Sequence, residues 1–212
     1  MQFALVPSVD YCHGIANVKT VAKLHPARCE PKVIRFGCHN TRRNLPANSA
    51  SKRGEANFLG AFERAYFASL SSPIDSFARG REFGLNGFGR ADMIWLAWRG
   101  KVESEDFCAL GLRRRIQLTA IEAKLKDWRK GLIQAARYRH FSNRAILVLP
   151  PATATTAVTF METFKALSVG LWEFDSVAGK ITKHTTPRLS KPLNLQAHAQ
   201  AMEMIKHRLE FS

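Results

Sequence analysis

Acidic residues are scarce in this sequence. Its 212 residues include 17 Asp and Glu against 32 Lys and Arg, which gives a formal net charge of +15. So large an excess of positive charge predicts an anionic partner, and nucleic acid is the commonest one. The alternative is a basic protein that is merely soluble, and the size of the imbalance makes us favour the polyanion.

Long apolar runs are lacking as well. No stretch is long enough to span a bilayer, so no membrane partner is expected. The N-terminus also lacks the charged start and the long apolar core of a secretory signal. A transit peptide would share the scarcity of acids before residue 55, where only Asp10 and Glu30 occur, but it would carry more Ser and a clearer amphipathic helix. The expected location is cytoplasmic, associated with the nucleoid if the source is bacterial.

Cysteine is rare, with four residues at positions 12, 29, 38 and 108. Nothing suggests secretion, so we interpret them as free thiols in a reducing compartment. Structural zinc sites usually take their ligands at C-x2-C or H-x3-5-H spacing. Here Cys12 and Cys38 are each followed directly by histidine, and adjacent side chains in a strand point apart. Ordinary thiols and surface histidines are therefore favoured over a zinc site.

The chain has enough apolar residues for a real core, since hydrophobic residues make up 46% of it. Its length suits one domain with extensions. Residues 1–53 are broken by prolines and form a basic N-terminal extension, which either touches the partner or is a poorly ordered tail. The expected core spans residues 54–192, and a C-terminal helix occupies 193–212. No internal repeat is visible.

The order of predicted elements indicates an α/β layer fold. Apolar residues at helical spacing predict a helix that begins near 51–54 and ends near 71, and further helices at 127–141, 154–167 and 194–209. Strands are predicted at 90–98 and 116–125, paired antiparallel, and at 145–150 and 169–175, with 181–187 following after a turn. A short strand also fits residues 32–37, and 99–116 is predicted to be a loop.

The stretch "IEAKL" at the end of the 116–125 strand carries two charges, Glu122 and Lys124, two residues apart. Period-two geometry puts both on one face of the sheet and the intervening apolar residues on the other. Asp92 arrives on the neighbouring strand thirty residues earlier, which suits a hairpin partner. A second acid-x-Lys match, at 30–32, contains Pro31 and follows no strand, so it is set aside.

Two carboxylates and a lysine that converge on one sheet edge suit phosphodiester hydrolysis. Carboxylate oxygens are hard ligands that hold Mg²⁺ together with waters and a substrate phosphate. The metal acidifies a bound water, and a lysine can orient that water or stabilise the developing negative charge. The alternative is a structural salt bridge between Glu122 and Lys124, which is the commoner explanation for any one such pair. It is weakened here because Asp92, a basic helix and the net charge all agree.

The helix predicted at 127–141 adds polar groups beside this site. Lys130, Gln134 and Arg137 fall along one face, with Tyr138 at its edge, and Gln134 and Tyr138 are neighbours because they are four residues apart. A glutamine can hydrogen-bond a water or a phosphate, and arginine can neutralise backbone charge. For Arg139 and the histidine after it, a solvated polar face is an equal alternative.

The segments GRAD (89–92), IEAK (121–124) and QAARY (134–138) resemble the PD-(D/E)XK nuclease superfamily, which has the restriction-endonuclease-like fold. The third segment is similar to the Q-x3-Y motif of its exonuclease branch and of several phage or repair branches. The resemblance covers about residues 54–150 and extends more loosely through 169–175. It implies a central mixed β-sheet flanked by helices, with a restriction-endonuclease-like core. Ala91 stands where the name-giving motif has proline, at a position that varies within the superfamily.

The same resemblance implies roles for individual residues. Asp92, Glu122 and the carbonyl of Ala123 would bind the metal, and Lys124 would be the catalytic lysine. Family members often add a glutamate from the first helix. Glu55 matches that place best and Glu63 second, although a first-turn glutamate can also simply complement the helix dipole. Gln134 and Tyr138 would support the site.

The expected function is therefore that of a Mg²⁺- or Mn²⁺-dependent deoxyribonuclease, and we favour an endonuclease over an exonuclease. DNA is the expected partner, and a homodimer is compatible with cleavage of both strands. The residues expected to contact the DNA backbone are basic: Arg90, Arg113, Arg114, Arg115, Lys130 and Arg137. The alternatives are a non-catalytic nucleic-acid-binding module on the same fold, a phage or mobile-element assembly protein, and an RNA substrate in place of DNA.

Overall fold

The computed structural model describes residues 32–34, 49–70, 76–113 and 115–209. The strands in this part of the chain are β1 (Lys32–Ile34), β2 (Ser76–Leu85), β3 (Gly89–Trp98), β4 (Ile116–Ala123), β5 (Arg144–Leu149), β6 (Val169–Asp175) and β7 (Lys180–Thr185). The helices are α1 (Ser49–Ser69), α2 (Phe107–Leu112), α3 (Trp128–Tyr138), α4 (Pro151–Val158), α5 (Met161–Ala166) and α6 (Leu195–Lys206).

The described strands form one mixed sheet in which spatial order follows chain order, from β1 to β7. Strands β2, β3 and β4 form an antiparallel meander. Strands β4, β5 and β6 run parallel, so the chain must cross over between them, and it does so through α3 and then through α4 and α5. At the edges β1 is parallel to β2 and β7 is antiparallel to β6.

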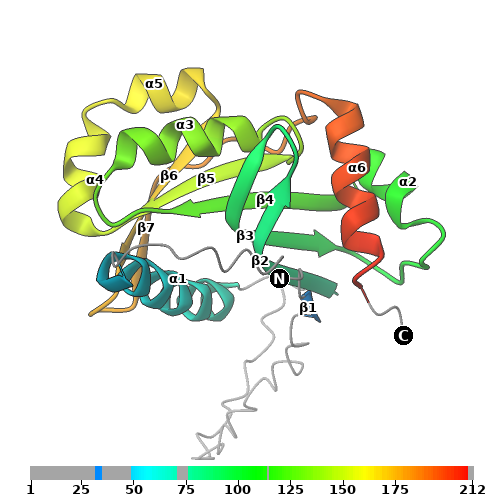
Figure 1. Cartoon of the computed structure of the whole chain (residues 1–212), viewed down its shortest axis with the longest axis horizontal. Helices are drawn as coiled ribbons and strands as arrows, with labels where there is room; N and C mark the ends of the chain where they lie inside the picture. Colours follow the sequence, from blue (N-terminus) through cyan, green and yellow to red (C-terminus); the bar gives the residue numbers. More distant parts are fainter. Residues whose placement is uncertain (1–31, 35–48, 71–75, 114, 210–212) are drawn as a thin grey trace, which may run out of the picture.

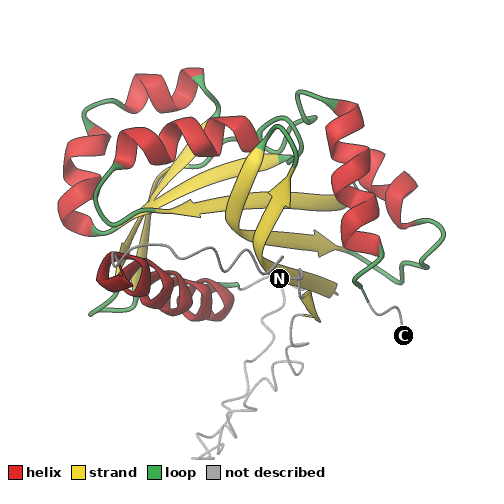
Figure 2. Cartoon of the chain, in the orientation of Figure 1, coloured by secondary structure: helices red, strands yellow, loops and turns green. Residues whose placement is uncertain are grey.

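Helices cover both faces of the sheet, as Figures 1 and 2 show. One face packs on α1 through an aromatic cluster that joins Phe62 and Tyr66 of the helix to Trp95 and Trp172 of the sheet. The other face packs on α2, α3, α4, α5 and α6. The predicted α/β fold with a mixed sheet flanked by helices is therefore confirmed.

Local sequence explains how the central elements form. Every residue of β5 after Arg144 is fully buried, which is why this parallel strand reads as a continuous apolar run. Helix α3 begins after Asp127, whose side chain accepts a hydrogen bond from the backbone N–H of Lys130 at 3.1 Å. Asn194 caps α6 in the same way, with Ala197 as the donor.

Three predictions about elements were wrong or incomplete. Strand β2 was not predicted, because Arg79 and Arg81 interrupt the apolar pattern expected of a buried strand. Both arginines pair with buried Glu63 of α1 in place of an apolar contact. The expected loop at 99–116 contains α2. The single helix expected at 154–167 is two helices, since the threonine-rich stretch before Phe160 has low helix propensity and Phe160 turns to pack on Trp128.

Several expectations fall on residues that the structure does not describe. These are most of the N-terminal extension 1–53, the cysteines at 12, 29 and 38, and Arg114. Cys108 is described and is a free thiol, as predicted. No helix among the described residues is long and apolar enough to cross a membrane. The division into extension, core and C-terminal helix stays a prediction, although α6 itself is present and packs into the main core.

Candidate active site

Asp92 and Glu122 lie side by side where the β3–β4 ladder ends. The last backbone pair between these strands is Met93–Ile121, so Asp92 and Glu122 are the next residues on each strand. The carboxylate of half-buried Asp92 accepts a hydrogen bond from the backbone N–H of Ala123 at 2.9 Å, which bridges the two strands beyond the ladder. The predicted hairpin-like relation of the two acids is confirmed.

Glu122 is the most buried acid of the site, with 1% of its surface exposed. Burial and the neighbouring charge of Asp92 together raise the pKa of the Glu122 carboxyl to about 7. Each carboxylate oxygen has a partner: Oε1 lies 2.7 Å from Nζ of Lys124, and Oε2 lies 2.6 Å from the hydroxyl of Tyr138. These contacts oppose the rise without cancelling it, which leaves a carboxyl poised near neutral pH.

Lys124 follows directly after β4, and its side chain is 15% exposed. Its backbone N–H donates to Val148 of β5 at 3.1 Å, which fixes the chain at the point where the strand pairing ends. Burial lowers the pKa of the Lys124 amine, but the hydrogen bond to Glu122 and the charges of Glu122, Asp92 and Glu55 raise it further, so the net shift is upward. The amine is therefore held as a cation against the carboxylates.

Helix α3 supplies the polar groups on the other side of Glu122. The hydroxyl of Tyr138 is 2.6 Å from both Glu122 Oε2 and the backbone carbonyl of Arg90. Gly131 lies two turns earlier on the same helix face, where a Cβ would come within 2.8 Å of Lys124 Cγ. Gln134 lies between these two contacts along the face, as residues three to four apart do. Its Oε1 is buried and has no hydrogen-bond partner in the described part of the chain.

The placement of Tyr138 differs from the sequence prediction in one respect. The sequence predicted Tyr138 at the edge of the polar face of α3, and Phe141 on that face. In the structure the side chains of Tyr138 and Phe141 are buried against the sheet, with 1% and 0% of their surface exposed. The tyrosine is thus a core residue whose hydroxyl alone reaches the site. Burial raises the pKa of the phenol, and the charge of Glu122 and the hydrogen bond to it raise this pKa further.

The two glutamates considered on α1 have different environments. Glu55 is half-buried, and its charge contributes to raising the pKa of Asp92, after burial and Glu82, and that of Lys124, after Glu122 and Asp92, so it lies within electrostatic range of the site. Glu63 is 4% exposed and forms ion pairs with Arg79 and Arg81 on β2. Glu63 therefore holds α1 to the sheet, and Glu55 is the α1 carboxylate that acts on the site.

A further acid, Glu82 on β2, was missed by the sequence analysis. It lies opposite Asp92, between the pairs Arg81–Met93 and Phe83–Ala91 of the β2–β3 hairpin. Glu82, Asp92 and Glu122 therefore form one row across three adjacent strands. The charge of Glu82 contributes to raising the pKa of Asp92 after burial. Counting back from the Asn86–Gly87 turn would have found this neighbour.

The backbone at Glu82 explains how this row is built. Glu82 has φ +56°, in the left-handed region that non-glycine residues avoid. Before it, Arg81 faces α1, whereas Phe83 after it faces the α3 side and contacts Phe141 with ring centroids 5.5 Å apart. Residues two apart on a regular strand share a face, so the strand switches faces at Glu82. Strand β3 switches at Asp92, since Ala91 and Met93 belong to the opposite cores.

The basic residues expected to bind DNA are distributed unevenly around this site. Arg90 is beside it: its side chain is 70% exposed and its Nε lies 3.0 Å from Glu82 Oε2. Lys130 and Arg137 are exposed on α3. Arg113 and Arg115 precede β4, whose first residue, Ile116, is about 20 Å from Glu122, since six steps at a rise of about 3.3 Å per residue separate the two. They do not belong to the same cluster as the two acids.

The donor set fits a hard divalent cation that keeps part of its water shell. Among the described residues no three Asp, Glu, His or Cys side chains are grouped closely enough to form a complete cage. Magnesium needs only one or two carboxylates, because it retains several waters. The adjacent carboxylates of Asp92 and Glu122 and the unpartnered Oε1 of Gln134 are consistent with such a hydrated ion. The described contact of Ala123 is through its N–H to Asp92, and its carbonyl stays a predicted ligand.

Comparison with known proteins adds no assignment. No protein-family model, curated protein or solved structure matches this chain.

Proposed function

We propose that this chain is a Mg²⁺-dependent nuclease of the PD-(D/E)XK type that hydrolyses phosphodiester bonds in DNA. The observation that carries the proposal is the meeting of Asp92, Glu122 and Lys124, from two strands, around one buried position. A plain salt bridge between Glu122 and Lys124 would not need a second carboxylate beside it that raises the pKa of Glu122.

The arrangement of elements supports the restriction-endonuclease-like core that the motif resemblance implies. Helix α1, the antiparallel strands β2–β4, helix α3 and the parallel strand β5 follow one another in that order. The two acids end neighbouring strands of this unit, and the Gln134–Tyr138 pair lies on the helix that follows. All three segments of the resemblance thus contribute to one site.

Asp92 and Glu122 would hold the metal, which would acidify a water and stabilise negative charge on the phosphate. Lys124, held as a cation at 2.7 Å from Glu122, is placed to orient the attacking water or to neutralise charge that develops on the phosphate. Tyr138 fixes the orientation of Glu122 through its hydroxyl, and the free Oε1 of Gln134 can accept a hydrogen bond from a water of the site. Glu55 is placed to orient a water or to interact with a second ion.

DNA as substrate is supported by charge. The net charge of +15 predicts association with a polyanion that weakens steeply as salt rises. Exposed Arg90 at the mouth of the site and exposed Lys130 and Arg137 on α3 are the described residues best placed to contact the backbone. A homodimer would allow two sites to cut both strands of a duplex.

The test is cleavage of supercoiled plasmid, linear duplex and branched DNA in Mg²⁺, in Mn²⁺ and in EDTA. We expect metal-dependent cleavage by the wild type, and a loss of at least about a hundredfold in Lys124→Ala and Glu122→Gln, as for groups that act only in the transition state. Lys126→Ala is the matched control, because Lys126 is an exposed lysine two residues beyond Lys124. This variant should cleave DNA as the wild type does.

Binding of the same DNA by the inactive variants separates this proposal from its alternatives. Wild-type affinity in Lys124→Ala, together with lost cleavage, supports a nuclease. Equal cleavage by wild type and both site variants would remove the proposed mechanism. Salt-dependent binding without cleavage by any form would leave the non-catalytic nucleic-acid-binding module. Preference for RNA over DNA in either assay would replace the substrate.

A further inference from the structure

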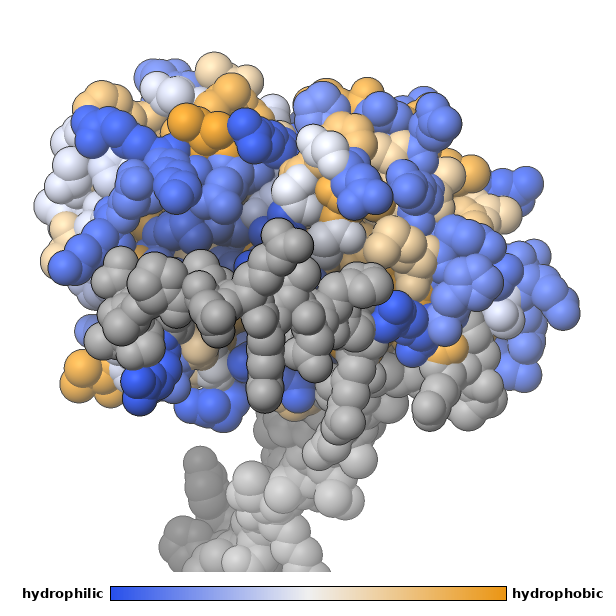
Figure 3. Space-filling view, in the orientation of Figure 1, coloured by the Kyte–Doolittle hydropathy of each residue, from blue (hydrophilic) through white to orange (hydrophobic). Residues whose placement is uncertain are grey.

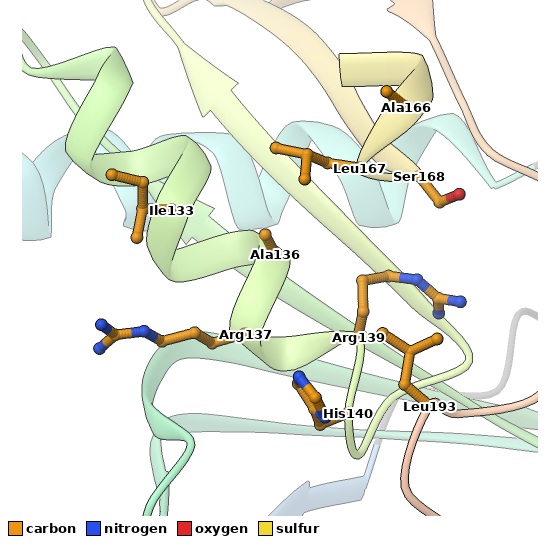
Figure 4. Close-up of a pocket in the computed structure, with 9 residues that line it drawn as sticks. All are labelled: Ile133, Ala136, Arg137, Arg139, His140, Ala166, Leu167, Ser168 and Leu193. Atoms are coloured by element: carbon orange, nitrogen blue, oxygen red, sulfur yellow. The ribbon is translucent and has the colours of Figure 1, made fainter. Parts of the chain in front are cut away.

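A pocket of about 500 Å³ lies on the outer side of α3, away from the sheet and from the acids of the site (Figure 4). Its walls come from the second half of α3, from the residues that follow it, from the end of α5 and from Leu193. Figure 3 shows apolar surface between α3 and α5, at the upper left of the view. None of the proposed metal ligands lines this pocket, and neither does Lys124; of the described residues proposed to contact DNA, Arg137 alone is in its lining.

Three large aliphatic side chains line the pocket and are open to solvent. Ile133 is 57% exposed, Leu167 is 42% exposed and Leu193 is 67% exposed. They come from three separate elements, and Figure 4 shows them around a common space. Exposed apolar residues that gather in a concave place with a polar rim are typical of a binding site, because scattered ones would need no explanation.

The polar part of the pocket is cationic. Arg139 is 4% exposed, and its guanidinium donates to the backbone carbonyl of Ser142 at 2.9 Å and to the hydroxyl of Ser190 at 2.5 Å. Among the described residues no carboxylate pairs with it, and burial lowers the pKa of the guanidinium. The C-terminal end of α3 carries partial negative charge that favours a cation, but it does not neutralise a full one. A buried unpaired charge of this kind is expensive, and an anion in the pocket would relieve it.

The neighbouring groups have the same sign. Arg137 is exposed on the rim, His140 lies beside it, and the lining contains no acidic side chain. The lining contains no Phe, Tyr or Trp, and the ring of His140 already packs against Phe88, with ring centroids 5.2 Å apart. An aliphatic wall beside arginines therefore fits an amino-acid side chain better than a base.

We propose that this pocket binds a segment of an acidic partner protein, in which an aliphatic side chain enters the cavity and carboxylates on either side of it meet Arg137 and Arg139, whose guanidinium groups point to opposite sides in Figure 4. Charge complementarity with a chain of net charge +15 favours an acidic partner over a neutral one. This interaction shares Arg137 with the proposed DNA contacts but involves neither the acids of the site nor Lys124.

The probe is a blocked hexapeptide that alternates leucine and glutamate, titrated into the full chain and followed by calorimetry and by amide NMR shifts. Two further peptides, one with glutamine in place of glutamate and one with alanine in place of leucine, separate the two parts of the contact. We expect saturable binding of the first peptide and a loss of about tenfold or more for each of the others, as for one buried side chain or one charge-assisted contact. The shifts should centre on Ile133, Leu167 and Leu193.

Variants of the protein complete the test. Leu193→Ser, Ile133→Ser and Arg137→Gln should each weaken binding about tenfold with unchanged circular dichroism, since all three side chains are exposed. Leu195→Ser is the matched control for the leucine, because it is 55% exposed two residues away and outside the pocket, and Arg64→Gln on the far face is the control for charge.

Three results would overturn the proposal. One is no saturable binding at millimolar peptide, and another is equal binding of the glutamate and glutamine peptides. The third is displacement of the peptide by a duplex oligonucleotide whose own binding is weakened by Leu193→Ser, which would make this a nucleic-acid pocket. Because the peptide assay can be carried out with Lys124→Ala, its failure is distinguishable from a failure of the nuclease proposal.

Discussion

Replacement of Glu82 by glycine and by alanine tests whether the backbone at this position is strained. Both changes remove the carboxylate and its contact with Arg90, so they differ only in the backbone preference of the new residue. Glu82 has φ +56°, a conformation that glycine adopts freely and alanine does not. The comparison therefore isolates the strain at the point where β2 switches faces.

The expected difference follows from two opposing terms. A left-handed backbone costs a non-glycine residue roughly 1–2 kcal/mol. Glycine loses roughly 0.5–1 kcal/mol more conformational free energy than alanine on folding. We therefore expect Glu82→Gly to be more stable than Glu82→Ala by about 0.7 kcal/mol, which corresponds to a melting temperature higher by about 2 °C in a chain of this size.

The measurement is urea unfolding of both variants, with melting temperatures as a second readout. Lys183 on β7 is the matched control, because it is an exposed strand residue without a positive φ. There the order should invert, with Lys183→Ala more stable than Lys183→Gly by roughly 0.5–1 kcal/mol. If alanine is as stable as glycine at position 82, the backbone there is not strained and the account of the face switch fails.

Three further changes probe the centre of the site. Without metal, the raised pKa of Glu122 stabilises the folded protein below pH 4.5, the pKa of this carboxyl in the unfolded chain, and this stability is lost as pH rises through about 7. The free energy of unfolding of the wild type, measured in urea, should therefore fall by roughly 3 kcal/mol relative to that of Glu122→Gln between pH 4.5 and pH 8. The same pH dependence in both proteins would contradict this. Gly131→Ala should lower the free energy of unfolding by about 1–3 kcal/mol, because the new Cβ would lie 2.7 Å from Leu147 and 2.8 Å from Lys124. DNA cleavage by this variant should also fall. A rise in the free energy of unfolding by about 1 kcal/mol, the helix propensity of alanine over glycine, would refute the contact. Tyr138→Phe should destabilise by about 1–3 kcal/mol, since it leaves Oε2 of buried Glu122 without its hydrogen-bond donor, and unchanged urea unfolding would show that the hydroxyl is dispensable.

The elements that the sequence predicts correctly are those whose pattern reflects burial directly. Strand β5 is a continuous apolar run, and α3 shows one apolar stripe after a capping aspartate, so both are visible without tertiary information. The pair Glu122–Lys124 is also visible, because period-two geometry alone puts the two charges on one face. The ion pair at 2.7 Å agrees with that expectation.

The features that escape prediction depend on partners distant in the chain. Arg81 makes β2 look polar, and only its pairing with Glu63 on α1 shows why a charged residue faces a helix. Tyr138 was predicted at the edge of a polar face, because its position in the helical repeat borders both the polar and the apolar side of α3. Its burial follows from packing under the β2–β3 hairpin that carries Arg90. The left-handed backbone at Glu82 has no signal in residue type, since glutamate rarely adopts it.

The electrostatics of the site are opposite to those of the chain as a whole, and this contrast favours a cation over an anion as a ligand there. The charged groups that act on one another at the site are Glu55, Glu82, Asp92, Glu122, Arg90 and Lys124. Among these groups the carboxylates outnumber the cations, so the site is more negative than a chain of net charge +15 would suggest. A phosphate attracted by the basic surface would be repelled by the negative charge of the site, whereas a divalent cation would neutralise that charge. The cation would also lower the pKa of Glu122, because it favours the ionised carboxylate. Mg²⁺ should therefore stabilise the wild type increasingly from pH 5 to pH 8, and this effect should disappear in Glu122→Gln. An equal stabilisation of both proteins by Mg²⁺ would show that the ion does not bind at this site.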